Sequence, residues 1–236
     1  MTAALEVRNL YAGYGKTTVI RDLNLSVPEG STVALLGPNG AGKTSTLGAI
    51  TGSVKVTSGA IVMGNTNITR LSTYDRAKRG IALIPEGRGI FPGLTVGENL
   101  QIAADSAQGV DASWKREQMN RVEEMFPPVR ERAKQRCGSL SGGEQQMVAM
   151  SRAFLSNPKV LLMDEISVGL APMIVELLYQ AVARLKQDGT TIVLVEQYLT
   201  YALKFADICY VMGKGTVNFV GEPGELQGEA AGASYL

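Results

Sequence analysis

The sequence predicts an α/β protein with a mainly parallel β-sheet, an antiparallel β layer and an inserted helical subdomain. Apolar runs that suit buried strands alternate with segments of helical spacing, which is typical of parallel sheets. Short, closely spaced strand patterns near the amino terminus indicate the antiparallel layer. Between about residues 87 and 157 the pattern is mainly helical and interrupts the alternation. We therefore expect a single domain over residues 1–236, with its core at 1–86 and 158–236.

The amino-terminal part predicts three strands, at residues 5–10, 17–20 and 23–27. Tyr11 and Tyr14 fall between the first two. An aromatic ring at this point could stack on an adenine base, because every base offers a π face. A place in the core or at a sheet edge is the simpler explanation, and position alone favours it.

A glycine-rich loop follows the apolar run at residues 32–36 and precedes a predicted helix at 45–51. Its sequence, Gly37-Pro38-Asn39-Gly40-Ala41-Gly42-Lys43-Thr44, matches the phosphate-binding pattern G-x-x-x-x-G-K-[ST]. Glycines let backbone N–H groups point at one phosphate, and the positive end of the helix adds to the attraction. Lys43 supplies a charge for the β- and γ-phosphates, and Thr44 supplies a hydroxyl for Mg²⁺. The alternative is a connection between a strand and a helix that uses glycine only for its backbone freedom. Of the two, we expect nucleotide binding.

The middle of the chain changes from strands to helices. Short strands are predicted at residues 59–63 and 81–84. A helix then opens near Val96, and charge-rich spacing predicts an exposed helix at 114–125 that Pro127 ends. These helices begin the predicted subdomain.

The subdomain ends in Leu140-Ser141-Gly142-Gly143-Glu144-Gln145-Gln146, followed by helical spacing to residue 154. Ser141 and Glu144 form a capping box, which explains both residues without a ligand. The capping box leaves the two glycines unexplained, since each costs about 1 kcal/mol against alanine in a helix. A helix terminus that must approach a phosphate closely would explain them.

Two carboxylates leave an almost wholly apolar strand at residues 160–163. Asp164 and Glu165 follow at its carboxyl end, which is where α/β sheets bind ligands. Asp164 could cap a helix, but a pair of acids at this point favours a metal ion and a proton acceptor. One carboxylate that helps to hold Mg²⁺ and one that polarises a water molecule describe nucleotide hydrolysis.

The last part of the chain resumes the alternation. The predicted elements are a helix at residues 173–185, a strand at 191–195 with Gln197 at its end, a helix at 198–205, and strands at 208–212 and 217–220.

The composition narrows the possible functions. A hydrophobic share of 45% and a charged share of 19% are typical of a globular protein. A net charge of +1 with mixed signs predicts no electrostatic binding to nucleic acid or anionic lipid. The chain has no histidine, so acid–base chemistry must fall to carboxylates. Cys137 and Cys209 fit no metal spacing, which favours buried or idle thiols in a reducing compartment.

Nothing in the sequence predicts direct insertion into a membrane. No apolar run approaches the roughly 20 residues that a membrane-spanning helix needs. The amino terminus lacks the basic region and apolar core of a signal peptide. If the protein works at a membrane, we expect a partner to hold it there.

In this order and spacing, the phosphate loop, residues 140–146 and Met163-Asp164-Glu165 resemble the ATP-binding subunits of ABC transporters. The likeness runs from about Leu5 to Glu222, and it is closest to the ATPases of bacterial branched-chain amino acid importers and their urea and amide relatives. The narrower likeness is carried by Pro85-Glu86-Gly87-Arg88, Leu94-Thr95-Val96-Gly97-Glu98-Asn99-Leu100, Gly169-Leu170-Ala171-Pro172 and Val195-Glu196-Gln197.

The resemblance implies a P-loop NTPase core that uses ATP and Mg²⁺, and it assigns roles to individual residues. Nucleotide would be bound by Tyr14, which stacks on adenine, and by Gly37, Pro38, Asn39, Gly40, Ala41, Gly42, Lys43, Thr44 and Ser45. The metal ion would be held by Thr44, Asp164 and Glu86. Catalysis would fall to Glu165 as the base for the attacking water, with Gln197, Lys43 and Glu86. The signature residues Ser141, Gly142, Gly143 and Glu144 would reach the γ-phosphate of a nucleotide held by the opposite subunit.

The resemblance also implies an assembly at the cytoplasmic face of the cell membrane, to which this chain would attach peripherally. The expected partners are a second ATPase subunit, related or identical, two integral membrane permease subunits and an extracytoplasmic solute-binding protein, with no nucleic acid. ATP hydrolysis would then be coupled to import of branched-chain amino acids or related small polar solutes. An exporter ATPase is one alternative, because the membrane partner decides the direction of transport. A soluble ABC-type ATPase without transport is another, although such proteins carry long coiled coils or a second ATPase half.

Four residues depart from the wider superfamily. Glu86, Gln197 and Ala171 stand where most members have glutamine, histidine and aspartate, and all three changes recur in the narrower importer group. Ile166 replaces a proline that is usual even in that group. The loop after Glu165 therefore lacks the restriction on its backbone that this proline would supply.

Overall fold

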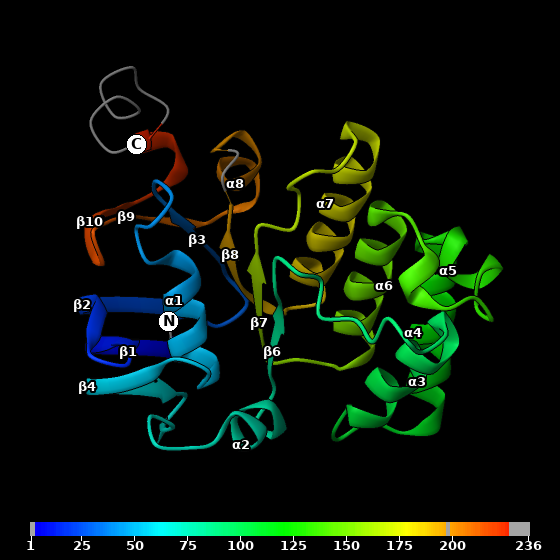
Figure 1. The fold of residues 1–236 in the computed structure, drawn as a ribbon, viewed down its shortest axis with the longest axis horizontal. Coiled ribbons are helices and arrows are strands. Elements are labelled where there is room, and N and C mark those ends of the chain that lie inside the picture. The colour runs from blue at the N-terminus through cyan, green and yellow to red at the C-terminus, as the bar shows by residue number, and fades with distance from the viewer. Residues whose placement is uncertain (1–2, 197–198, 227–236) are drawn as a thin grey trace.

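The computed structural model describes residues 3–196 and 199–226, and Figure 1 shows the arrangement of their strands and helices. In chain order the elements are β1 (Ala3–Tyr14), β2 (Thr17–Pro28), β3 (Thr32–Leu36), α1 (Lys43–Thr51), β4 (Lys55–Met63), β5 (Thr66–Asn67), α2 (Thr73–Lys78), β6 (Ile81–Ile84), α3 (Val96–Ser106), α4 (Ala112–Met125), α5 (Pro127–Glu131), the 3₁₀ helix η1 (Cys137–Ser139), α6 (Gly142–Leu155), β7 (Val160–Asp164), α7 (Pro172–Gln187), β8 (Thr191–Val195), α8 (Leu199–Phe205), β9 (Ile208–Gly213), β10 (Thr216–Gly221) and the 3₁₀ helix η2 (Pro223–Leu226).

The main sheet has the strand order β10-β9-β3-β8-β7-β6 within the described residues. β3 pairs in parallel with β8 and β9, β7 pairs in parallel with β6 and β8, and β10 closes one edge antiparallel to β9. Every residue of β3, β7 and β8 is buried. Such strands are covered on both faces, which is why the sequence shows them as continuous apolar runs. The predicted fold class, a mainly parallel sheet with an antiparallel layer beside it, is confirmed.

The second sheet is antiparallel, with the strand order β2-β1-β4-β5. Here the sequence-based boundaries are wrong, because the two strands expected at residues 17–20 and 23–27 form the single strand β2. Asp22 keeps the strand continuous by adopting a left-handed backbone with φ 47°, and Asn9 on β1 does the same with φ 44°. The Asn9 side-chain amide donates to Asp22 Oδ1 at 3.0 Å, so the two irregular positions support each other. Tyr11 and Tyr14 lie within β1, and not between two strands as expected.

Helix α1 lies between the two sheets. It contacts β1, β2 and β4 of the antiparallel sheet and β6 and β7 of the main sheet. Its apolar side chains, including those of Leu47 and Ile50, belong to one buried cluster that joins both sheets. This helix starts at Lys43, two residues before the predicted start.

The buried guanidinium of Arg76, on α2, closes the carboxyl end of α1. Arg76 is 3% exposed. It donates to the carbonyl oxygens of Ala49 at 2.6 Å and Ile50 at 2.9 Å, and also to those of Thr69 at 2.7 Å and Leu71 at 3.1 Å. The last carbonyl groups of a helix have no partner inside the helix, so a cation at this end satisfies them. No helix was expected from the sequence over the residues of α2.

Helices α3 to α6 lie together on one side of β6 and β7, and the antiparallel sheet lies on the other side (Figure 1). α6 contacts α3, α4, α5 and α7 and also touches β6. Pro127, expected to end a helix, ends α4 and opens α5 as one of its first residues. In the part of the chain that the structure describes, no helix is long and apolar enough to cross a membrane.

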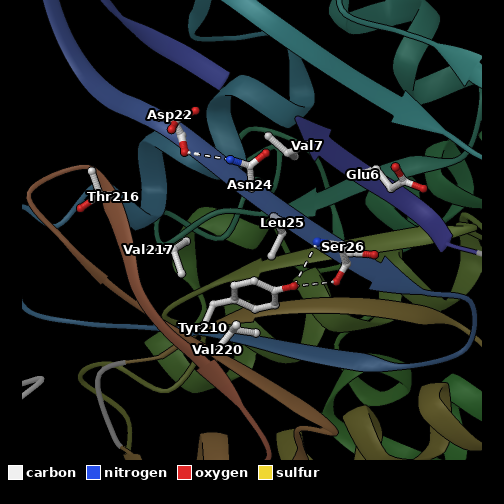
Figure 2. Close-up of a pocket in the computed structure, with 10 residues that line it drawn as sticks. All are labelled: Glu6, Val7, Asp22, Asn24, Leu25, Ser26, Tyr210, Thr216, Val217 and Val220. Atoms are coloured by element: carbon white, nitrogen blue, oxygen red, sulfur yellow. Dashed lines mark hydrogen bonds between the residues drawn. The ribbon is translucent and has the colours of Figure 1, made fainter. Parts of the chain in front are cut away.

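The two sheets are also joined directly. A groove of about 540 Å³ lies between β2 and the β9–β10 pair, and Figure 2 shows residues that line it. Among these residues, the Tyr210 hydroxyl accepts from the N–H of Ser26 at 3.1 Å and donates to the Ser26 carbonyl oxygen at 3.3 Å. A single side chain thus links β9 to β2.

Candidate functional site

The phosphate loop joins the end of β3 to α1, and the β9–β10 hairpin supports it. Gly37 has φ 137°, and a Cβ there would lie 2.2 Å from the Met212 carbonyl oxygen. Only glycine fits a backbone with both features. The N–H of Gly215 donates to the Ala41 carbonyl oxygen at 3.0 Å. The loop is therefore fixed by contacts with residues far away in the sequence.

The charged end of Lys43 turns back over this loop. Lys43 is 5% exposed, and its Nζ donates to the carbonyl oxygens of Gly37 at 2.8 Å and Pro38 at 3.2 Å. The first-turn N–H groups of α1 have no acceptor inside the helix, and its N-cap residue, Gly42, provides no side-chain acceptor. Free N–H groups, a helix N-terminus and a buried ammonium suit an anion such as a phosphate group.

The loop and the acidic pair come together across the sheet. Thr44 Oγ1 donates to Asp164 Oδ1 at 3.2 Å, although the two residues are 120 positions apart. Asp164 is 3% exposed, and burial is the main reason that its pKa is raised. The hydrogen bond from Thr44 lowers this pKa, whereas the negative charges of Glu165 and Glu86 raise it. Two carboxylates thus act on a third, buried one.

These residues fit a hard divalent cation. A hydroxyl and a buried carboxylate are oxygen ligands of the kind that Mg²⁺ prefers, and Mg²⁺ usually completes its shell with water and phosphate oxygens. A cation would also offset the cost of ionising Asp164 in a buried place. Within the described ranges, no group of three or more acidic, cysteine or histidine side chains could hold a metal ion without other ligands. A metal here would therefore need the hydroxyl of Thr44 and oxygens of a bound phosphate.

Glu165 follows Asp164 with an unusual backbone. Its φ is 48°, a left-handed conformation that costs a non-glycine residue about 1–2 kcal/mol. Its N–H donates to the Val195 carbonyl oxygen at 2.9 Å, which fixes it to the end of β8. Its side chain is partly exposed, whereas Asp164 is buried. Strain of this kind persists where neighbouring structure enforces it, and it is frequent at active sites.

Tyr14 is 54% exposed, so the structure excludes a core position for it. Its hydroxyl lies 3.4 Å from the Ser45 hydroxyl on α1, which places the ring beside the phosphate loop. An exposed aromatic next to a phosphate site is well placed to stack on a base.

The signature segment forms the amino terminus of α6. The Ser141 N–H donates to Glu144 Oε2 at 2.8 Å and the Glu144 N–H donates back to Ser141 Oγ at 3.4 Å, which completes the predicted capping box. A Cβ at Gly143 would meet Ile174 at 3.3 Å, and one at Gly142 would meet the Arg88 guanidinium at 2.9 Å. The chain's own packing therefore explains part of the need for glycine, which the sequence analysis had attributed to a ligand alone.

Two further predicted site residues remain. Glu86 is exposed in the segment after β6. Arg88, with φ 68°, donates to the Gln145 side-chain oxygen, so this segment is tied to α6. Gln197 lies outside the described residues.

Sequence reasoning missed a buried carboxylate beside this site. Glu196 follows β8 and accepts a hydrogen bond from Ser167 at 2.8 Å. A signal was present in the sequence, because an acidic residue directly after an apolar buried strand is costly without partners. The resemblance to a family was based in part on the segment Val195-Glu196-Gln197, but no chemical role was assigned to Glu196.

Comparison with known proteins agrees with this geometry. A family model described as ABC transporter matches residues 20–168. The chain is 41% identical over 204 residues to BraG of Pseudomonas aeruginosa, a high-affinity branched-chain amino acid transport ATP-binding protein, with 86% of each chain covered. It is 36% identical to LivF of Archaeoglobus fulgidus, a probable branched-chain amino acid transport ATP-binding protein, with 94% of this chain and 93% of LivF covered. It is 33% identical to LptB of Escherichia coli, a lipopolysaccharide export system ATP-binding protein, with 99% and 97% covered.

Solved structures show the same architecture. An ATP-binding subunit of an ABC transporter matches with a TM-score of 0.84 and 29% identity, covering 95% of this chain and 92% of that one. A dimeric ATP-binding cassette in a post-hydrolysis state with ADP and Pi matches with a TM-score of 0.81 and 25% identity, covering 93% and 98%.

Proposed function

We infer the function from the premise that this chain belongs to the ABC transporter family, as an ATP-binding subunit that hydrolyses ATP. We propose that it powers an importer of branched-chain amino acids or related small polar solutes. The observation that carries the mechanism is the contact between Thr44 and Asp164, which brings the phosphate loop and the acidic pair to one point. The names of BraG and LivF support the choice of solute.

The proposed mechanism uses each group according to its chemistry. Lys43 and the N–H groups of the loop hold the phosphates, while the Tyr14 ring stacks on adenine. Thr44 and Asp164, with Glu86 nearby, would hold Mg²⁺, which when bound neutralises charge that develops on the phosphate oxygens. The remaining two roles belong to Glu165 and Gln197.

Glu165 accepts the proton of the attacking water, because it is a carboxylate next to the proposed metal site and the chain offers no histidine base. Gln197 orients that water or the γ-phosphate, since an amide cannot accept a proton at neutral pH. The test is Glu165→Gln, for which we expect unchanged ATP binding and a turnover at least about 100-fold lower. Turnover within a few-fold of the wild type would refute the assignment.

We propose that the complete site is shared between two ATPase subunits. The phosphate loop opens α1 and the signature opens α6, and these helices lie on opposite sides of β6 and β7 (Figure 1). Face-to-face pairing would bring Ser141 and its neighbours to the γ-phosphate on the partner. Mixing a Lys43→Ala subunit with a Gly142→Asp subunit gives one intact site in each mixed dimer.

We expect ATPase activity, or at least ATP-dependent pairing seen by light scattering, to return on mixing. If neither appears while the wild type hydrolyses ATP at a rate per subunit that is independent of dilution, the shared site is excluded.

The membrane partner is proposed to bind in a cleft between the β6 edge and helices α3 and α6. The cleft has a volume of about 740 Å³, and its lining includes Leu83 and Ile102, which are 36% and 42% exposed. Arg88 and Arg152 also line it. Because Arg88 lies in the same segment as Glu86, a partner bound in the cleft would contact a segment of the proposed nucleotide site. This coupling would link hydrolysis to transport at the cytoplasmic face of the membrane, with two permease subunits and an external solute-binding protein.

The test is Ile102→Asp, for which we expect loss of copurifying membrane proteins with the ATPase activity of the isolated chain preserved. Val220→Asp is the matched control, because Val220 is 55% exposed on β10 and does not line the cleft. Unchanged copurification of the Ile102→Asp chain would refute this docking site.

An exporter role is the second candidate function, supported by the likeness to LptB. The identity of the copurifying membrane proteins decides between an importer and an exporter.

A further inference from the structure

One buried charge has no role in the mechanism proposed above. Glu196 is 1% exposed and stands directly between the end of β8 and Gln197. A carboxylate this deep destabilises a protein unless its partners offset the loss of water. The groups that contact Glu196 therefore indicate which part of the structure this carboxylate stabilises.

The first partner belongs to the loop that carries Glu165. Ser167, which is 2% exposed, donates from Oγ to Glu196 Oε2 at 2.8 Å. It lies two residues after Glu165, in the connection from β7 to α7. Hydrogen bonds to an ionised acceptor are about twice as strong as neutral ones. The carboxylate thus fixes the loop close to the proposed base.

The second partner is an aromatic group that reaches α8. Tyr179 on α7 is 2% exposed and lies next to Glu196. Burial raises the pKa of Tyr179 most, and the charge of Glu196 and a hydrogen bond to its carboxylate raise this pKa further. The ring stacks on Tyr201 and Phe205, with centroids 4.8 Å and 4.9 Å away. Glu196 therefore lies where the Glu165 loop, α7 and α8 meet.

The loop needs such support for two reasons. Glu165 has a left-handed backbone, which persists only where the surroundings enforce it. The loop also contains Gly169 and has no proline before Pro172, so its sequence does little to restrict its backbone. Within the residues that the structure describes, the Glu165 N–H bonds to the Val195 carbonyl and Ser167 bonds to Glu196, and both contacts hold the loop to the end of β8 and the residue that follows.

We propose that Glu196 is a positioning residue, which acts through Ser167 to hold Glu165 in the conformation that hydrolysis requires. The inference rests on the proposed function of Glu165 as the base. A positioning role and a merely structural role differ in their kinetics. Loss of positioning lowers kcat and leaves KM for ATP unchanged, because the phosphate loop and Tyr14 are untouched. Loss of structure would lower ATP binding and turnover together.

The experiment uses three variants of the full chain. Glu196→Leu removes the acceptor, Ser167→Ala removes the donor, and Glu196→Gln keeps an oxygen that accepts from Ser167. We expect the first two to lower kcat at least tenfold with KM within threefold of the wild type, and Glu196→Gln to stay within threefold in both. The double variant should be no slower than the slower single variant, because both act through one bond.

Ser31→Ala is the matched control, because the Ser31 hydroxyl bonds to the Pro28 carbonyl near the amino end of β3 and should not affect kcat. The inference is overturned if Ser167→Ala stays within twofold of the wild type, if Glu196→Gln is as slow as Glu196→Leu, or if KM rises as much as kcat falls. If Glu196→Leu does not fold, Ser167→Ala decides alone. A wild type without ATPase activity would overturn the proposed function, and the inference with it, whereas active variants overturn the inference alone.

Discussion

Arg76 offers the sharpest test of how the fold supports the nucleotide site. Its guanidinium bonds to the buried carbonyl group of Ile50 in the last turn of α1, to two carbonyl groups outside the helix, and to that of Ala49, which also accepts from the Gly52 N–H at 3.3 Å. Each buried acceptor left without a partner costs about 1–3 kcal/mol, and the apolar contacts of a methionine at this position would offset part of the loss. We expect Arg76→Met to lower the free energy of unfolding by about 3 kcal/mol. For a chain of this size that corresponds to a melting temperature lower by roughly 6–12 °C.

Thermal and urea unfolding of the two chains measure this difference. Arg79→Met is the matched control, since Arg79 is an exposed arginine three residues further along, at the carboxyl end of α2. The control should unfold within about 0.5 kcal/mol of the wild type, as is usual for surface changes. If Arg76→Met behaves like the control, the guanidinium does not hold the end of α1 and the reasoning is wrong.

Three other outcomes follow from the structure. Gly37→Ala should abolish nucleotide binding in a calorimetric titration, because its Cβ would lie 2.2 Å from a carbonyl oxygen of β9. Gly40 has φ 80° and open space around it, so Gly40→Ala should cost only the backbone strain of about 1–2 kcal/mol. Equal losses of affinity in the two variants would contradict this distinction. Gln197→Ala should slow turnover without moving the pH profile, and a shifted acidic limb would show that Gln197 tunes the base. Burial raises the pKa of Cys209 to about 11, so the folded protein should react slowly with a thiol reagent at pH 8 and rapidly in denaturant. Since an unfolded thiol ionises near pH 8.5, this cysteine also makes stability fall as the pH rises from about 8.5 to 11, and fast labelling of the native chain would refute its burial.

The fold class was predictable because its strongest signals are local. Buried strands such as β3 and β8 appear in the sequence as apolar runs with the observed bounds. The errors arose where backbone conformation overrides pattern. β2 continues through Asp22 because a left-handed residue there is matched by Asn9 on the neighbouring strand, and no local pattern reports such a pair. α2 was missed because six residues are too few to establish a helical period.

The candidate site divides in the same way. The phosphate loop and the acids after β7 follow a motif whose chemistry is local, so their positions could be named from the sequence. The hydrogen bond between Ser167 and Glu196 joins segments 29 residues apart, and it becomes visible only when the strand order is known. The contact of Gly142 with Arg88 is of the same kind. Such contacts depend on tertiary packing, which propensity and spacing do not encode.

The support of the phosphate loop by the β9–β10 hairpin has a consequence for synthesis on the ribosome. Ala41 receives its hydrogen bond from Gly215, and Gly37 rests against Met212, both near the carboxyl end of the chain. Domains form as their segments leave the ribosome, amino-terminal parts first. The strands that pair with β3, namely β8 and β9, are synthesised after it. A growing chain that already contains the whole phosphate-loop motif therefore still lacks the β9–β10 hairpin that supports the loop. We therefore expect ATP to stabilise the phosphate loop only after β9 and β10 have been synthesised, because truncated chains that end before β9 carry the motif without the hairpin that supports it.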